Sequence, residues 1–254
     1  MTVVNFSEYM DTAIQQMSFD YVCPKTAFSK SENTVESYVK HPLRRNFTRH
    51  EHMFKMVTFG NGTVASVHPD LLDWCTKYLF SISGSESFHF LHLHTINQKL
   101  LQVGYRLADP MMGFIPTALP EVPDSGQFLY KWFERPDILT MDEDDRFKNA
   151  LQYNPKSEYP DMLAVAALHQ DEIVGIAGVS ADSLTMWQIG VDVMQAFRGH
   201  GLASYLVSAL AQETVTRQAL PYYCTRFSNI PSQRVALRCG FVPVWSEVYA
   251  IPIQ

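Results

Sequence analysis

A glycine-containing turn, Arg198-Gly199-His200-Gly201, stands directly before an apolar helical pattern. The first-turn amides of a helix have no internal partner and carry partial positive charge, so they attract anions. Glycines reach positive φ and carry no Cβ atom, which lets a bulky phosphate approach the backbone. The Arg198 guanidinium adds donors suited to phosphate. The turn is therefore predicted to bind a pyrophosphate at the N-terminus of the following helix.

The turn alone leaves alternatives open. A glycine-containing turn that only joins a strand to a helix fits the stretch equally well. A dinucleotide-binding fingerprint fits less well, because the third glycine of GxGxxG is missing and the preceding strands do not form a βαβ pattern. A P-loop is excluded, because the Gly-Lys-Ser/Thr sequence is missing.

A mixed α/β pattern positions the turn. Segments rich in Val, Ile and Ala at 162–168, 173–180 and 186–193 predict an antiparallel meander that ends just before it. A strand at 127–133 comes earlier. After the meander come a helix over 199–217, a strand PYYCTRF, a helix around SQRVALRCG and one or two strands in FVPVWSEVYAIPI. This order predicts an α/β fold with a mixed sheet, of the α+β kind.

An acidic run, Asp142 to Asp145, lies in TMDEDDRFKNAL. Thr140 and Glu143 stand at capping-box spacing, so we expect a helix whose first turn carries these acids. Carboxylates in a first turn are favoured by the helix dipole, which explains the run without a metal ion.

The N-terminal part shows its own strand and helix signals. FGNGTVASV predicts a turn and a strand, PDLLDWCTKYLF a helix with Pro69 in its first turn, and TINQKLLQVGYRL a helix that ends at Gly104. The alternation in SFHFLHLH predicts a strand with His92 and His94 on one face and His89 on the other. Two histidines at this spacing can bind zinc, but a third ligand is not evident, so we expect no metal site.

Three prolines, a glycine and two acids in PTALPEVPDSG mark a boundary. We therefore expect an N-terminal α/β domain over 1–120 and a second domain over 126–254. NQKLLQVGYRLADPMMGFIP (97–116) is similar, without gaps, to QRVALRCGFVPVWSEVYAIP (233–252). We hypothesise that the N-terminal half is a degenerate copy of the C-terminal fold that lacks the glycine turn. The alternative is a chance similarity between two amphipathic helices that end at glycine.

Two motifs in the C-terminal half occur in a characteristic order, V-x-x-x-x-R-G-x-G-L-A and then N-x-x-S with G-F eight residues later. The residues are Val193, Arg198, Gly199, Gly201, Leu202 and Ala203, followed by Asn229, Ser232, Gly240 and Phe241. Together they resemble the GNAT N-acetyltransferase superfamily, over about 127–254. The resemblance implies the GNAT fold in this half and acetyl-CoA as the cofactor.

The resemblance also assigns roles to residues. The pyrophosphate of acetyl-CoA would be held by the turn and the helix start, which here are Arg198, Gly199, His200, Gly201, Leu202, Ala203 and Ser204. The splayed end of the preceding strand would pair with the pantetheine arm through the backbones of Val191 and Val193. Asn229 would touch the cofactor, and Ser232 is the next candidate. His200 is expected to place its ring in solvent beside the phosphate.

The chain departs from the family pattern at two positions. Relatives often carry a tyrosine in the last helix as the acid for the leaving thiolate, and this chain has Ala236 there. Tyr222, Tyr223 and Cys224 on the neighbouring strand are the candidate substitutes, with Tyr222 the one we name, and buried aromatic packing is the alternative. Relatives also carry a carboxylate early on the strand that ends at Val193. Asp192 is the acid of that strand, either a base or, as we favour, a structural acid that caps the next turn.

Composition limits the partners. Apolar residues make up 46% of the 254 residues, and the net charge is −6, which argues against nucleic acid. No apolar stretch reaches membrane-spanning length, and the four cysteines form no CxxC pair. We expect a cytoplasmic protein with reduced thiols that acts on a small-molecule amine, with a homodimer as an open alternative to a monomer. The function expected is acetyl-CoA-dependent N-acetyl transfer to a primary amine; the alternative is a non-catalytic CoA-binding or regulatory protein.

Overall fold

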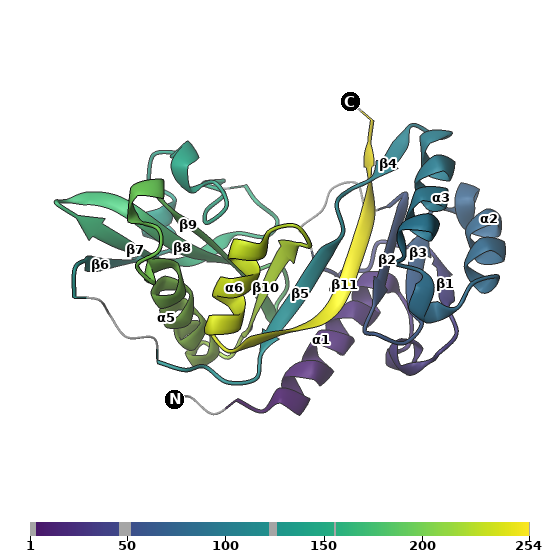
Figure 1. Cartoon of the computed structure of the whole chain (residues 1–254), viewed down its shortest axis with the longest axis horizontal. Coiled ribbons are helices and arrows are strands. Elements are labelled where there is room, and N and C mark those ends of the chain that lie inside the picture. Colours follow the sequence, from purple (N-terminus) through teal and green to yellow (C-terminus); the bar gives the residue numbers. More distant parts are fainter. Residues whose placement is uncertain (1–3, 46–51, 122–125, 155, 254) are drawn as a thin grey trace. The chain divides into compact units, whose positions relative to one another are not determined.

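The structure is a computed structural model that describes residues 4–45, 52–121, 126–154 and 156–253. The chain folds into two compact units (Figure 1). The first comprises Met1–Thr12, Phe114–Cys224 and Asn229–Val242; the second comprises Ala13–Gly113, Thr225–Ser228 and Pro243–Gln254. This division differs from the expected boundary between 1–120 and 126–254, because the last strand pairs with an N-terminal one. Part of the expected linker, 122–125, lies outside the described residues.

The first unit carries the predicted meander. Its elements are β6 (Leu129–Glu134), α4 (Arg135–Ile138), the 3-10 turn Asp145–Phe147, β7 (Asp161–His169), β8 (Glu172–Ser180), β9 (Met186–Val193), α5 (Leu202–Thr216), β10 (Leu220–Arg226) and α6 (Ile230–Arg238). The strand order is β10-β9-β8-β7-β6, antiparallel from β6 to β9 and parallel between β9 and β10. The predicted mixed α/β sheet is therefore confirmed.

Packing on both faces of this sheet follows from the sequence. Helix α5 lies against β7, β8 and β9 and buries Leu206, Val207 and Leu210 at helical spacing. On the sheet, Gly178 and Gly190 adjoin the carbonyl oxygens of Ala150 and Asn149, where a Cβ atom would collide with backbone. These two glycines therefore let the 149–150 turn approach the strands closely.

The second unit is built around a smaller sheet. Its elements are α1 (Phe6–Tyr21, which begins in the first unit), β1 (Thr34–Ser37), β2 (Phe54–Thr58), β3 (Thr63–Val67), α2 (Pro69–Phe80), α3 (Phe90–Leu101) and β4 (Tyr105–Leu107). The strand order is β1-β3-β2-β11, with β4 also paired to β11 (Phe241–Pro252). β5 (Met111–Pro116) and β11 each contribute residues to both units.

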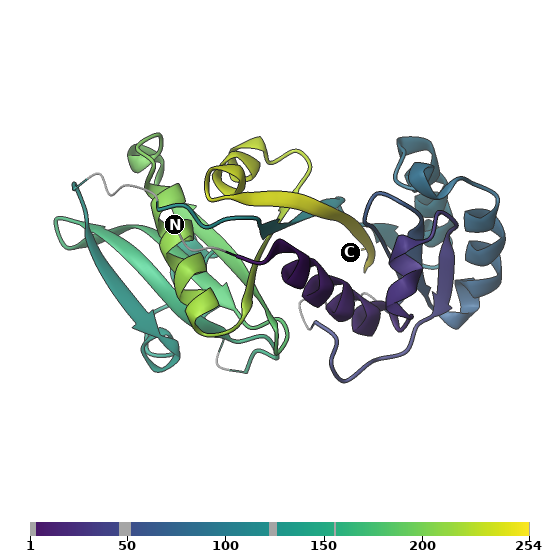
Figure 2. The same cartoon turned by 90° about the horizontal axis from the view of Figure 1, so that it is seen from below.

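Helices α2 and α3 lie beside the strands of the second unit (Figure 2). Their apolar side chains form the core of this unit against those strands. Phe54 and Met56 of β2 pack there with Leu71 of α2 and Leu100 of α3. The predicted α2 is confirmed: Pro69 lies in its first turn, and His68 caps it by accepting a hydrogen bond from the Asp70 amide. The helix that ends near Gly104, where φ is +79°, is confirmed as well.

Two local predictions were wrong. SFHFLHLH is not a strand, because Phe90–Leu101 form α3. Burial in α3 follows helical spacing through Ile96 and Leu100, whereas Phe90 and Leu91 are exposed. An apolar run this short does not distinguish period 2 from period 3.6.

The expected capping box of Thr140 and Glu143 does not form. The box lies six residues earlier, where Glu134 and Asp137 cap α4. The Thr140 hydroxyl instead donates to the Asp137 carbonyl, and Asp144 caps the 3-10 turn that follows. A proline within the first turn fixes the helix start near Arg135 and so decides between the two sites.

The hypothesis of a degenerate repeat requires a sheet and a closing helix in the N-terminal half. The second unit has both, and α3 and α6 each end at a glycine of positive φ that leads into a strand (Gly104, +79°; Gly240, +81°). The strands differ, since β4 is short whereas β11 is continuous. The repeat stays a prediction.

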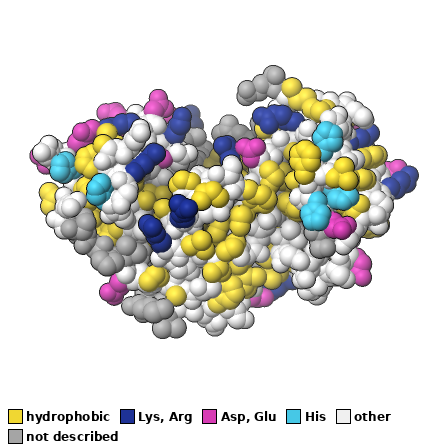
Figure 3. Space-filling view, in the orientation of Figure 1, with side chains coloured by type: hydrophobic (Ala, Val, Ile, Leu, Met, Phe, Trp, Pro, Cys, Tyr) yellow, Lys and Arg dark blue, Asp and Glu magenta, His cyan; other side chains and the backbone are white. Residues whose placement is uncertain are grey.

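Some features of the described residues concern membrane insertion, metal binding and disulfide bonds. None of their helices is long and apolar enough to cross a bilayer, and no three or more of their His, Cys, Asp and Glu side chains gather as metal ligands would. All four cysteines are thiols. On the face shown in Figure 3, basic side chains are interspersed with acidic and apolar ones.

Candidate functional site

The first component of the site is an edge of β9 that β10 leaves open. Pairing between the two strands runs from Met186↔Leu220 to Ile189↔Tyr223 and then stops, although β9 stays paired with β8 as far as Val193. The Met194 amide donates to β8, so strand alternation points the amides and carbonyls of Val191 and Val193 toward the opposite edge. The two backbones predicted to face the cofactor therefore lie where the strands diverge.

The second component is the turn that follows β9. Gly199 and Gly201 adopt φ of +86° and +80°, and a Cβ atom built on either would have no heavy atom within 4 Å. The first backbone bond of α5 is donated by the Tyr205 amide to the Gly201 carbonyl. Within the described residues, no hydrogen bond uses the amides of 199–204. They form a set of donors with open space in front of the two glycines, which fits a pyrophosphate.

The side chains around the turn have different roles. Arg198 Nε donates to the Val193 carbonyl at 2.9 Å, so this guanidinium also joins the turn to the end of β9. His200 is exposed, as expected. Leu202 and Ser204 are buried, and Ala203 is half-buried. Leu202 and Ser204 can therefore contribute only their backbone amides to an anion site.

The third component of the site is the start of helix α6. Asn229 caps the helix, its Oδ1 accepting a hydrogen bond from the Ser232 amide at 3.2 Å. The Ser232 hydroxyl lies 2.8 Å from the hydroxyl of Tyr223 on β10. Asn229 is exposed, so its amide nitrogen faces solvent while its oxygen fixes the helix start.

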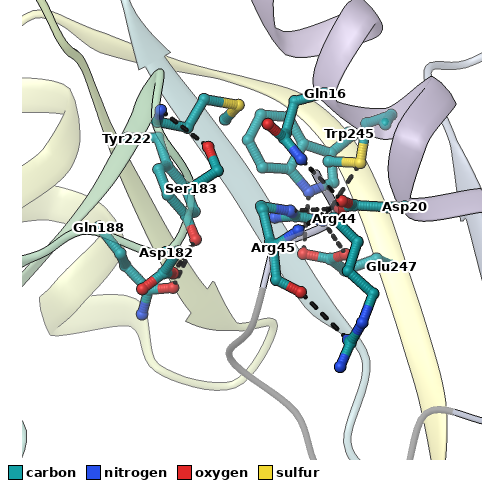
Figure 4. A network of polar contacts seen from close by, with 12 residues as sticks. Gln16, Asp20, Arg44, Arg45, Asp182, Ser183, Gln188, Tyr222, Trp245 and Glu247 are labelled. Carbon is teal, nitrogen blue, oxygen red and sulfur yellow. Dashed lines mark hydrogen bonds and ion pairs between the residues drawn. The ribbon is translucent and has the colours of Figure 1, made fainter. Parts of the chain in front are cut away.

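The structure does not support Tyr222 as the acid. Its side chain is fully buried, and its hydroxyl donates to the Asp182 carboxylate and lies 2.9 Å from Gln188 Oε1 (Figure 4). Ser180 Oγ donates to the same carboxylate at 2.8 Å. Because side chains alternate along a strand, Tyr222 and Tyr223 lie on opposite faces of β10. Asp182 has no local signal of burial, so the sequence did not predict this buried carboxylate beside Gln188.

Asp192 has the structural role that we favoured. Its carboxylate accepts three hydrogen bonds, from the Asn149 amide at 2.8 Å, from Asn149 Nδ2 at 2.8 Å and from the Ala150 amide at 3.2 Å. The turn that it caps is 149–150, however, and not the one after β9. Sequence spacing cannot show which segment packs against a strand face across more than 40 residues.

We expect Asp192→Asn to lower the free energy of unfolding by about 1–3 kcal/mol, because an amide cannot accept all three bonds to backbone and side-chain N–H groups. Urea denaturation measures the loss. The affinity for CoA should change little in the folded variant. A large loss of turnover at unchanged stability would show instead that Asp192 acts as a base.

Comparison with known proteins identifies the class. Residues 126–241 match the family described as Acetyltransferase (GNAT) family. This segment is therefore a GNAT acetyltransferase domain. It contains the β6–β10 sheet and the glycine turn before α5. Acetyl-CoA is the usual donor substrate of this family.

The chain is also similar to solved structures. A GCN5-related N-acetyltransferase-like protein from Streptococcus suis is 16% identical, over 64% of this chain and 69% of that one, with a TM-score of 0.48. A GNAT-family acetyltransferase from Colwellia psychrerythraea is 10% identical, over 100% and 99% of the two chains, with a TM-score of 0.44. A tandem GNAT protein from the clavulanic acid biosynthesis pathway is 14% identical, over 60% and 56%, with a TM-score of 0.41. No curated protein matched.

Proposed function

We propose that this protein transfers the acetyl group of acetyl-CoA to a primary amine of a small molecule. The observation that carries the proposal is the set of unbonded amides at 199–204, which lies directly beyond the open edge of β9. A pyrophosphate on these amides would direct the rest of the donor toward Val191 and Val193. Acetyl-CoA supplies an acetyl group activated as a thioester, and it is a substrate rather than a resident group.

The chain contributes position and charge stabilisation. The open backbone of Val191 and the amide of Val193 can pair with the amides of the pantetheine arm, as a neighbouring strand would, while the Val193 carbonyl is bonded to Arg198. A backbone amide held at the thioester carbonyl stabilises the negative charge that develops on its oxygen. Holding amine and thioester in line supplies much of the remaining acceleration. Because Asp192 is bonded to the 149–150 turn, the amine proton passes to water in this scheme.

A second candidate is a CoA-binding protein without catalytic activity. Two observations favour it: Ala236 is fully buried and carries no polar group, and Asp192 serves the fold. This protein would keep the amides of the turn and therefore bind CoA, but it would release no thiol in the presence of amines.

Titration calorimetry with acetyl-CoA, followed by a thiol-release screen over primary amines, separates these functions. We expect binding, and thiol release with at least one amine class. Binding without release from any amine would support the second candidate. If millimolar acetyl-CoA does not bind, both are wrong.

A further inference from the structure

Tyr223 lies at the point where β9 and β10 separate. It forms the last register pair with Ile189, and from the next residue onward the edge of β9 has no pairing with β10. A ligand that occupied this edge would end against that pair. Tyr223 therefore lies where the open edge of β9 meets the last residues that pair with β10.

The ring of Tyr223 points to the α6 side of the sheet. Its hydroxyl contacts Ser232 Oγ in the first turn of α6, and its ring contacts Phe241 with centroids 6.4 Å apart. Ser232 and Ala236 are one turn apart and share a face of α6. Ala236 offers only a methyl group on that face, whereas Tyr223 and Ser232 place two hydroxyl groups there.

The surroundings of Tyr223 favour the protonated form. Burial raises the pKa of Tyr223 above its usual value, more than the hydrogen bond with Ser232 lowers it. Asp192 and Cys239 act in the same direction as burial. The phenol therefore carries its proton throughout the neutral pH range. Tyr222, in contrast, donates to a carboxylate on the other face of β10.

We infer that the Tyr223 hydroxyl protonates the sulfur that leaves acetyl-CoA and that Ser232 relays a proton back to it. This inference rests on the proposed function. The amine nitrogen bonds to the acetyl carbon while the bond from that carbon to sulfur breaks. The sulfur keeps the electron pair and takes the Tyr223 proton. The amine loses one proton to water, and one proton returns from water to the phenolate through the Ser232 hydroxyl.

Coenzyme A itself is the probe, because its free thiol is the product of this step. Thiolate absorbance in the far ultraviolet is followed against pH for the bound molecule. A hydroxyl that donates to sulfur stabilises the thiolate, so the bound thiol should titrate at lower pH than free CoA. In Tyr223→Phe it should titrate at higher pH than in wild type, and in Tyr222→Phe at the wild-type position. Thiol release with the best amine should fall about 100-fold in Tyr223→Phe.

The outcomes distinguish a failure of the proposed function from a failure of the role inferred for Tyr223. Failure of the wild-type protein to bind CoA overturns the proposed function and the inference together. Binding with a thiol that titrates at or above free CoA overturns the inference alone, without any variant. An unchanged titration in a folded Tyr223→Phe protein overturns it as well. Ser232→Ala should slow turnover with little change in the thiol titration; unchanged turnover would exclude the relay.

Discussion

Gly201→Val should weaken acetyl-CoA binding by about 10- to 100-fold, which corresponds to one or two hydrogen bonds to a charged group. A valine here would place a branched side chain in the open space in front of the first-turn amides of α5. That space is where a phosphate must lie to reach them. Calorimetry with CoA and with acetyl-CoA measures the loss.

A valine at this position also strains the backbone, so stability needs its own control. Gly201 has φ of +80°, a region that costs a β-branched residue about 1–3 kcal/mol. Gly104 is a matched site in the second unit, with φ of +79° and likewise no atom within 4 Å of a Cβ. Gly104→Val should therefore lose similar stability and keep its affinity. Equal affinity of a folded Gly201→Val protein and the wild type would exclude the turn as the phosphate site.

The sequence predicted the parts of the fold whose signals are local. The meander, the helix after Gly201 and the helix start at Pro69 depend on periodicity and turn residues within about fifteen positions. The open edge of β9 was reached only through the family resemblance, because divergence between two strands has no local pattern. The different surroundings of Tyr222 and Tyr223 likewise have no local sequence pattern. Alternation places them on opposite faces, but only the structure shows that one face holds Asp182 and the other holds Ser232.

A buried group of charged residues in the second unit also could not be predicted from the sequence. Arg45 donates to Asp20 of α1 at 2.5 Å and to Glu247 of β11 at 3.0 Å, and each side chain is at most 5% exposed (Figure 4). Trp245 donates to the same Glu247 carboxylate at 3.1 Å, and Lys55 of β2 adds a second cation. About 200 residues separate Glu247 from Arg45. Charged residues are mostly exposed, so nothing in the local sequence predicts that these lie in a core.

These buried ion pairs explain why the last strand, β11, packs in the second unit. Burial raises the pKa of Asp20, but the Arg45 and Lys55 charges outweigh it and hold that pKa below its ordinary value. Burial also lowers the pKa of Lys55 to about 8. Arg45 pairs with both carboxylates, so β11, α1 and the segment that ends at Arg45 depend on one another.

Arg45→Met should therefore lower the free energy of unfolding by about 3–5 kcal/mol, because it removes the cation that two buried carboxylates share. Arg217→Met is the matched control. It breaks the exposed pair with Glu134 and should cost at most about 1 kcal/mol. Urea denaturation at neutral pH measures both.

The pH dependence distinguishes lost charge pairing from lost packing. A carboxyl group whose pKa is lowered by folding stabilises the protein above its unfolded pKa, and this contribution disappears as the pH falls through the folded value. Without Arg45 the Asp20 carboxylate is protonated more readily, and protonation removes its charge. The difference in unfolding free energy between wild type and Arg45→Met should therefore shrink as the pH falls below about 4. A difference that stays constant from neutral to acid pH would mean that Arg45 acts through the packing of its side chain and not through its charge.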